Sequence, residues 1–308
     1  MVDENWFERQ EALIIGAGDS EKFGYMNVKP SKQTKIRHAY SITADILAFR
    51  RCSRQYGYFA VKGYVPAQTT QLYFGIVIHQ VLDRAHRQYR GLMEGRKEGM
   101  PTNEDIESYF RTVNESLRAR GIRPYSRMAE ASALEYLQRF NSEQGPRLYP
   151  RVLDTEHKLK ADFKDFLMHG VVDVLAGAEG NPEELEIWDY KGSKRVEDDS
   201  DEMKNYNFQM QVYGELYKKR HGKYPARAIL CFLGEKEKER MLVTVPLGSK
   251  SAQEAVNLFV ETVGEIERRR DKDDWSPPPV MPSRETCSVC DIRWDCPVAK
   301  SRFPLRRP

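Results

Sequence analysis

The chain has 308 residues, of which 31% are charged, but its formal net charge is only +3, so any basic surface must be local. No apolar run approaches the ~20 residues that cross a bilayer, and the N-terminus lacks the basic and apolar regions of a signal peptide, so we expect a cytoplasmic protein without membrane contact. The five cysteines are too few for a disulfide scaffold, and in a reducing compartment clustered cysteines more often bind metal.

The first predicted helix carries a cysteine in a basic setting. Residues 1–38 are polar and weakly patterned, which is typical of a loosely attached leader. Residues 40–59 then show helical spacing, with Ser41 or Thr43 as the candidate N-cap. Cys52 lies among arginines that would lower the pKa of its thiol, although a lone cysteine is more often a small buried hydrophobe. These arginines are Arg50, Arg51 and Arg54.

A second helix is predicted over residues 72–89, where apolar residues recur at helical spacing. His79 shares a face of this helix with Leu82, and the simpler interpretation of this placement is a hydrogen-bonded core histidine. His86 and His157 have no supporting context, and we interpret both as structural.

Residues 103–145 predict two amphipathic helices, the first capped by Asn103 and the second ending near Gly145. They would form either a helical arm over a cleft or a packing layer, and the pattern favours packing. Beyond them, residues 151–175 predict two strands. The first strand carries Glu156, which is a weak candidate for a functional site because glutamates are common in strands.

A hairpin in the middle of the chain gives the clearest chemical signal. Its predicted strands are GVVDVL and LEIWDYK, joined by a link rich in Gly, Asn and Pro. Because side chains alternate along a strand, Asp189 and Lys191 share one face. Asp173 and Asp189 are equally distant from Asn181, so a turn centred there would place their carboxylates opposite each other, roughly 4.5–5.5 Å apart at Cβ. Facing carboxylates need a cation between them, which predicts a metal site with a lysine at its edge.

The elements after the hairpin alternate between helix and strand. A helix ending at Gly222 stacks Gln209 and Tyr213 on one face, where a tyrosine is usually core but a glutamine is unusual. Two strands follow, and Cys231 within the first is most simply a buried thiol. A long amphipathic helix completes this part of the chain.

The C-terminal region presents Cys287, Cys290 and Cys296 with the spacing C-x2-C-x5-C. Three soft ligands need a fourth, and Cys52 is better placed than Cys231, which lies in an apolar strand. Zinc ribbons usually offer two C-x2-C pairs, whereas an iron–sulfur cluster accepts four thiolates from any chain path. The pattern therefore favours a cluster over zinc.

The helix with Cys52, the helix with His79, the central hairpin, the Gln209–Tyr213 pair and the closing cysteines follow one another along the chain. Taken in this order, they resemble the RecB-type nucleases of the PD-(D/E)XK superfamily, in the branch that carries a four-cysteine 4Fe-4S cluster. That branch includes CRISPR-associated RecB-like exonucleases, the AddB nuclease domain and related eukaryotic single-strand exonucleases. The matching segments are ILAFRRCSRQYGYF, GIVIHQVLD, GVVDVL, the D-Y-K run, the Q-x-x-x-Y pair and the closing cysteines.

The resemblance implies an α/β fold of the α+β type, with a restriction-endonuclease-like core in which a central mixed sheet is flanked by helices. It implies a nuclease core at 39–282 with a helical arm at 103–145, after the leader at 1–38. A C-terminal iron–sulfur segment at 283–308 would be closed by Cys52, with Cys287, Cys290 and Cys296 as the other cluster ligands.

The resemblance also implies a site for Mg²⁺ or Mn²⁺, hard ions that suit oxygen ligands and tolerate an imidazole. The implied ligands are His79, Asp173, Asp189, the backbone carbonyl of Tyr190 and, more weakly, Glu156. The implied catalytic residues are Asp173, Asp189, Lys191, Gln209 and Tyr213. Lys191 would orient a water or stabilise charge on the phosphate, and Gln209 and Tyr213 would position the DNA backbone. The basic residues Arg50, Arg51 and Arg54 would contact DNA.

The implied function is a metal-dependent DNA exonuclease acting on DNA ends, single-stranded or with overhangs. Its setting would be CRISPR adaptation, recombination and repair, or phage DNA metabolism, and a CRISPR integrase or a helicase subunit would be a candidate partner. Two alternatives stay open. One is a catalytically silent DNA-binding or scaffold subunit of a nuclease–helicase complex, and the other is a zinc-stabilised interaction protein in which the hairpin is a solvated turn.

Overall fold

The computed structural model describes residues 39–65, 70–93, 95, 98–163, 165–288 and 290–302. The predicted leader at 1–38 lies outside the described residues. None of the helices in the described ranges is long and apolar enough to span a bilayer.

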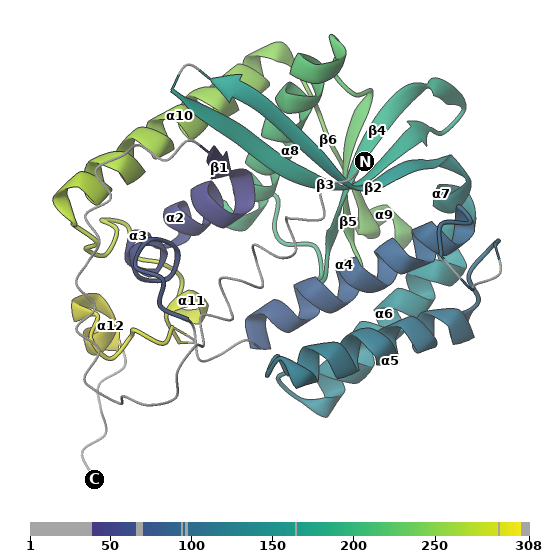
Figure 1. Cartoon of the computed structure of the whole chain (residues 1–308), viewed down its shortest axis with the longest axis horizontal. Helices are drawn as coiled ribbons and strands as arrows, with labels where there is room; N and C mark the ends of the chain where they lie inside the picture. The colour runs from purple at the N-terminus through teal and green to yellow at the C-terminus, as the bar shows by residue number, and fades with distance from the viewer. Residues whose placement is uncertain are drawn as a thin grey trace. The chain divides into compact units, whose positions relative to one another are not determined.

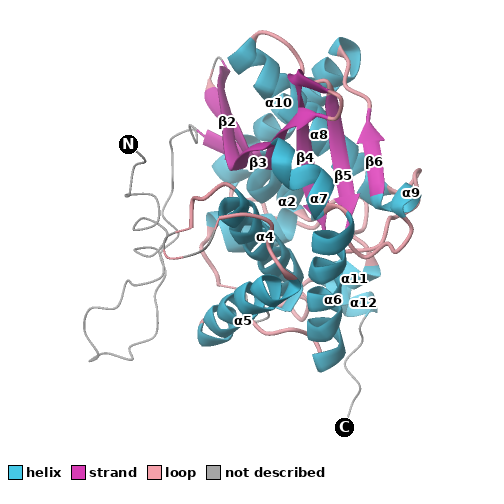
Figure 2. Cartoon of the chain, turned by 90° about the vertical axis from the view of Figure 1, so that its right-hand side faces the viewer, coloured by secondary structure: helices cyan, strands magenta, loops and turns pink. Residues whose placement is uncertain are grey.

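A six-stranded mixed sheet lies at the centre of the described part of the chain (Figures 1 and 2). Its strands are β1 (Ala39–Ser41), β2 (Val152–Phe163), β3 (Phe166–Ala178), β4 (Asn181–Lys191), β5 (Arg227–Phe232) and β6 (Leu242–Val245). β3 is hydrogen-bonded to β1, β2 and β4, and the sheet continues from β4 to β5 and β6. β2 pairs along one edge of β3, and β1 and β4 share the other edge. The pairs β1–β3 and β4–β5 are parallel, and the other pairs are antiparallel.

Helices cover both faces of the sheet, so the fold class expected from the sequence is confirmed. One core packs the sheet against α8 (Asp201–His221), α10 (Ser249–Lys272) and the N-terminal helical segment. The second core packs the opposite face against α4 (Thr70–Tyr89), α5 (Asn103–Ala119), α6 (Arg127–Glu143) and α7 (Gly145–Leu148). The shorter helices are α2 (Ala48–Arg51), α3 (Ser53–Tyr56), α9 (Lys238–Met241), α11 (Arg284–Ser288) and α12 (Pro297–Arg302).

The N-terminal segment departs from the single helix that the sequence predicts. The expected N-cap Ser41 does accept a hydrogen bond from the Ala44 N–H, but it also ends the short edge strand β1. The segment then runs as a π-helical turn, Ile42–Leu47, followed by α2 and α3. Cys52 separates these two helices because its backbone is extended, with φ −162° and ψ 107°.

The paired helices at 103–145 are present as predicted, but the first cap is different. Thr102, not Asn103, is the N-cap of α5, and it forms a capping box with Asp105. Thr102 accepts a hydrogen bond from the Asp105 N–H, and the Asp105 carboxylate accepts one from the Thr102 N–H. This reciprocal pair satisfies two backbone donors that the start of a helix otherwise leaves unpaired.

The register of the β3–β4 hairpin agrees with the prediction, although its turn does not. Val174 pairs with Trp188, which is the register that would place residues 173 and 189 opposite each other. The turn is tighter than expected, because Ala178 pairs directly with Asn181 across a two-residue turn. Gly180 in this turn has φ +83°, a left-handed conformation that glycine adopts without steric cost. An irregularity between Gly177 and Ala178 then shifts the register, so that the rest of the hairpin has the predicted pairing.

A buried charge fixes the hairpin at its turn end. Glu186 is fully buried, and its carboxylate accepts a hydrogen bond from Arg151 Nη1 at 3.0 Å and one from Trp188 Nε1 at 3.1 Å. Arg227 also pairs with this carboxylate, and Arg151 donates to the Gly177 carbonyl at 2.6 Å. A buried carboxylate is stable only when it is paired and hydrogen-bonded in this way.

Candidate active site

The chemistry-bearing residues gather where β4 separates from β3. The β3–β4 ladder ends at Val174 and Trp188, and β1 takes the same edge of β3 further along, at residues 167–169. We call the opening between them, at residues 170–173 of β3 and 189–191 of β4, the fork. Inside it, Asp173 Oδ2 accepts a hydrogen bond from the Tyr190 N–H at 2.6 Å. The carboxylate thus satisfies a backbone donor of β4 beyond the end of the β3–β4 ladder.

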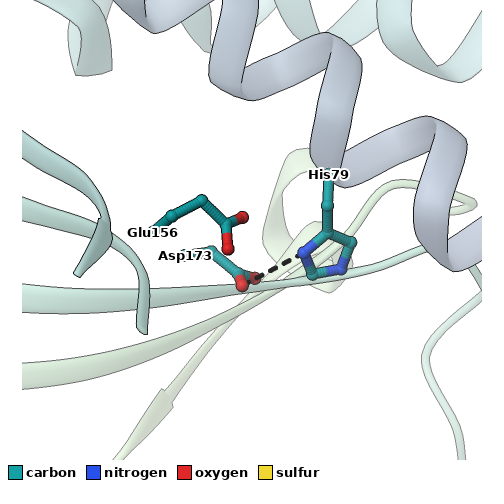
Figure 3. A group of neighbouring side chains, drawn as sticks. All are labelled: His79, Glu156 and Asp173. Carbon is teal, nitrogen blue, oxygen red and sulfur yellow. Dashed lines mark ion pairs between the residues drawn. The ribbon is translucent and has the colours of Figure 1, made fainter. Parts of the chain in front are cut away.

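Three potential ligands converge at the fork from three different elements (Figure 3). His79 of α4, Glu156 of β2 and Asp173 of β3 each offer an atom, and these atoms all lie within 4.8 Å of one another. His79 Nδ1 is 3.1 Å from Asp173 Oδ1. One imidazole and two carboxylates form a donor set suited to a hard divalent ion such as Mg²⁺ or Mn²⁺.

The carboxylates of this group raise the pKa values of its members. Burial disfavours the charged imidazole of His79, but the Asp173 carboxylate outweighs burial and raises the pKa of His79 to about 9. Desolvation, followed by the negative charge of Asp173, raises the pKa of Glu156 to about 7. Without a cation, protons on His79 and Glu156 therefore balance the negative charge of the carboxylates. A divalent ion would displace them, because metal ligands must be deprotonated.

Glu156 is held in an unusual backbone conformation. It has φ +49°, and the ladder between β2 and β3 pairs its neighbours Thr155 and His157 but omits Glu156 itself. A non-glycine residue in the left-handed region costs about 1–3 kcal/mol, and such strain gathers at functional sites. This backbone conformation is a signal that the sequence pattern does not carry, which is why the strand pattern gave only weak support for Glu156.

We expect Glu156→Gly to unfold at a higher denaturant concentration than Glu156→Ala in the absence of metal. Both substitutions remove the charge next to Asp173, but only glycine relaxes the left-handed backbone, which should raise the free energy of unfolding by about 0.5–1 kcal/mol. Denaturant titrations of both variants in a chelating buffer measure the difference. An alanine variant at least as stable as the glycine variant would show that Glu156 is not strained.

Asp189 and Lys191 belong to a second, connected network on β4 and α8. Lys191 Nζ is 2.6 Å from Asp189 Oδ2 and donates to Gln209 Oε1 at 3.0 Å. Gln209 Nε2 in turn donates to Asp189 Oδ1 at 2.8 Å and to the Tyr213 hydroxyl at 3.0 Å. The stacking of Gln209 and Tyr213 predicted from the sequence is thus present. The centre of the Tyr206 ring, a residue without a predicted role, lies 4.2 Å from Lys191 Nζ.

The two aspartates therefore have different surroundings. The sequence predicts a facing pair that shares one cation, whereas the three-ligand group contains Asp173 and the Asp189 carboxylate contacts Lys191 and Gln209. Burial raises the pKa of Asp189, the Lys191 ammonium opposes this rise, and the Asp173 charge adds to it. The Asp189 carboxylate thus interacts electrostatically with Asp173 and His79 of the three-ligand group.

Tyr190 links the fork to the other face of the sheet. Its N–H contacts Asp173, and its hydroxyl lies 2.8 Å from His86 Nε2 in the second core. His86 is almost fully buried, and burial lowers its pKa to about 3, so the imidazole is neutral. No sequence pattern connects His86 with the site, because His86 and Tyr190 are 104 positions apart in the chain.

The four cysteines of the predicted cluster line a single pocket, which we call the cysteine pocket. Its lining includes Cys52, Cys287, Cys290 and Cys296. Cys231 is instead fully buried in β5, as expected. The predicted low pKa of Cys52 is wrong, because burial raises the pKa of this thiol and outweighs its hydrogen bonds from neighbouring N–H groups.

The three arginines near Cys52 also differ from one another. Arg50 and Arg51 are exposed, and the guanidinium carbon of Arg50 lies 5.6 Å from the centre of the Phe208 ring. The Arg54 side chain is only 11% exposed and pairs with Asp295 at 3.0 Å, beside the C-terminal cysteines. Arg54 therefore joins the N-terminal helical segment to the C-terminal segment beside the cysteine pocket, and it does not face solvent.

Residues 44–297 match the family model of the PD-(D/E)XK nuclease superfamily. A solved structure from Eubacterium rectale, described as a "putative exonuclease", aligns with a TM-score of 0.49 and 14% identity, covering 93% of this chain and 96% of that one. A second solved structure, described only as SSO0001, aligns with a TM-score of 0.34 and 12% identity, covering 80% of this chain and 95% of that one. None of the curated proteins matches the chain.

Proposed function

The chain belongs to the PD-(D/E)XK nuclease superfamily, and on this basis we propose that it is a metal-dependent DNA exonuclease of the RecB-like branch. The observation that carries the proposal is the fork, where the group of His79, Glu156 and Asp173 lies beside the Lys191 network. A carboxylate–imidazole group next to a lysine suits the hydrolysis of a phosphodiester, whose transition state gathers negative charge.

The protein side chains would have distinct roles in this reaction. His79, Glu156 and Asp173 would hold Mg²⁺ or Mn²⁺, with Asp189 and the Tyr190 carbonyl as further proposed ligands. When bound, the ion would polarise the scissile phosphate and lower the pKa of a water molecule. Lys191 would donate hydrogen bonds to the phosphate oxygens as their charge grows.

Gln209 and Tyr213 would position the groups that act on the phosphate. Gln209 contacts both Lys191 and Asp189, so it fixes their distance and orientation, and Tyr213 fixes Gln209. Both tyrosine and glutamine are buried on α8. Their contribution would therefore be to hold Lys191 in place before substrate arrives, which reduces the reorganisation that the reaction requires.

The cysteine pocket is proposed to hold a structural 4Fe-4S cluster. Four thiols from distant parts of the chain line one pocket, and the charges of Cys287 and Cys290 act on Cys52. Four converging thiolates suit iron–sulfur clusters, and they also suit zinc. Such a centre would join the C-terminal segment at 283–308 to the nuclease core at 39–282.

Arg50 and Arg51 remain the proposed DNA-contacting residues near the fork. Both are exposed, and the charge of Arg51 acts on Tyr206, whose ring contacts Lys191. Arg54 is a weaker candidate because it pairs with Asp295. The candidate settings are CRISPR adaptation, repair and phage DNA metabolism, with a CRISPR integrase or helicase subunit as partner.

The proposal predicts that linear DNA is degraded from its ends and that covalently closed circles survive. Degradation should require Mg²⁺ or Mn²⁺ and stop on addition of EDTA, because the donor set at the fork suits hard divalent ions. The measurement compares product lengths from end-labelled linear DNA with the survival of closed circles. Equal cutting of circles would remove the exonuclease assignment, and cleavage in EDTA would contradict the role of the fork.

A further inference from the structure

The turn between α5 and α6 has a strongly basic, acid-free sequence. Residues 116–129, which we call the arm tip, contain four arginines and neither aspartate nor glutamate. The four arginines are Arg118, Arg120, Arg123 and Arg127, and all four are exposed. Arg118 pairs with Glu130 of α6 at 2.7 Å, which leaves the other three to define the charge of the tip. A chain with a net charge of only +3 therefore concentrates cationic side chains here.

The arm tip also presents a large aromatic side chain to solvent. Tyr125 is 89% exposed and Met128 is 78% exposed. The turn that carries them is well built, since the Ile122 N–H donates to the Leu117 carbonyl at 2.8 Å and Ile122 is buried. Ser126 then caps α6 by accepting a hydrogen bond from the Ala129 N–H at 3.1 Å. Tyr125 is thus fixed on an ordered turn directly before a helix, with its ring pointing away from the core.

The arm tip is connected to the helix that supplies His79. The Tyr73 hydroxyl of α4 donates to Asn114 Oδ1 of α5 at 3.0 Å, and both residues are buried. His79 lies six residues along α4 from Tyr73, and α5 continues five residues beyond Asn114 to Ala119, inside the tip. At 1.5 Å per residue, the tip is on the order of 20 Å from His79 measured along the helices. At the spacing of a duplex strand, roughly six nucleotides cover this distance.

We propose that the arm tip binds a single-stranded segment of nucleic acid whose end reaches the fork. Arginines attract the phosphates, and an exposed aromatic ring stacks on bases of any sequence because every base has a π-face. Lipid surfaces also attract cations and aromatic side chains, but the connection from the tip through α5 to α4 favours the substrate of the fork. The inference rests on the proposed function and adds to it the strand state of the substrate.

The test measures binding of a fluorescent oligothymidine to the full chain in EDTA, where no cleavage occurs. Arg120→Ala/Arg123→Ala should weaken binding and flatten the dependence of log affinity on log salt by about 0.7 for each phosphate that the variant no longer neutralises. The matched control is Lys236→Ala/Lys238→Ala, which removes two exposed cations from the connection between β5 and β6 and should leave the slope unchanged. Tyr125→Ala should weaken binding roughly five- to a hundred-fold, while Tyr125→Phe keeps the ring and should bind as the wild type does.

The possible outcomes distinguish a failure of the arm-tip proposal from a failure of the proposed nuclease function. Wild-type affinity and salt slope in Arg120→Ala/Arg123→Ala, together with wild-type affinity in Tyr125→Ala, would overturn the inference, even if the protein degrades DNA. Arm-dependent binding without any cleavage would instead leave the inference standing and contradict the nuclease proposal. If the arm variants lose binding to vesicles of anionic phospholipid but keep their affinity for the oligonucleotide, the tip is a membrane contact and the inference fails.

Discussion

Replacing Lys191 with alanine is expected to lower the rate of metal-dependent DNA cleavage by roughly a hundred- to a thousand-fold, the loss typical of a single donor that stabilises transition-state charge. The Lys191 ammonium lies within a network of Asp189, Gln209 and the Tyr206 ring, so it is positioned before any substrate binds. Single-turnover cleavage of end-labelled DNA measures the change. The matched control is Lys194→Ala, which removes an exposed lysine from the loop that follows.

Asp173→Asn should abolish the same activity for a different reason. This substitution removes one negative charge from the group of His79, Glu156 and Asp173, so it should also abolish the binding of Mn²⁺ measured by calorimetry. Lys191→Ala should keep the metal and lose only the rate. Wild-type cleavage by Lys191→Ala, or intact Mn²⁺ binding by Asp173→Asn, would refute the roles assigned to these residues.

The second large effect is expected at the cysteine pocket. Protein purified without oxygen should be brown and hold about four iron and four sulfide per chain if a 4Fe-4S cluster is present. Cys52→Ala should lose as much iron as Cys287→Ala, because each removes one of four ligands. Cys231→Ala should keep the iron, since Cys231 is buried in β5 away from the pocket lining. A colourless protein with one zinc per chain, or full iron in the Cys52 variant, would contradict the cluster.

Local patterns were sufficient to predict much of the candidate site. The hairpin register could be predicted because strand side chains alternate and the polar link limits where the turn can form. The register follows the prediction even though the turn is tighter, because the shift at Gly177 compensates. Gln209 and Tyr213 could be predicted to share a face because residues four apart stack on a helix.

Features that depend on contacts between distant segments could not be predicted in this way. The opening of the fork requires β1 and β4 to share one edge of β3, and a short strand of three residues carries little pattern of its own. Glycine and asparagine are the residues that indicate a left-handed backbone in a sequence, so a glutamate gives no sign of the conformation of Glu156. The ion pair between Arg54 and Asp295 joins residues 241 positions apart, so no local sequence pattern predicts it.

The pairing of β1 with β3 has a consequence for the order in which the chain folds. β1 is synthesised before the other five strands of the sheet, but its partner β3 follows only after the complete helical arm. The cysteine pocket is completed later still, when Cys287, Cys290 and Cys296 have left the ribosome. Closing such long loops costs entropy before any contact repays it, so these steps should be slow. The segment that carries Cys52 thus gains its last contacts only when the C-terminal cysteines are made. Any metal centre in the pocket must be inserted after translation has passed Cys296.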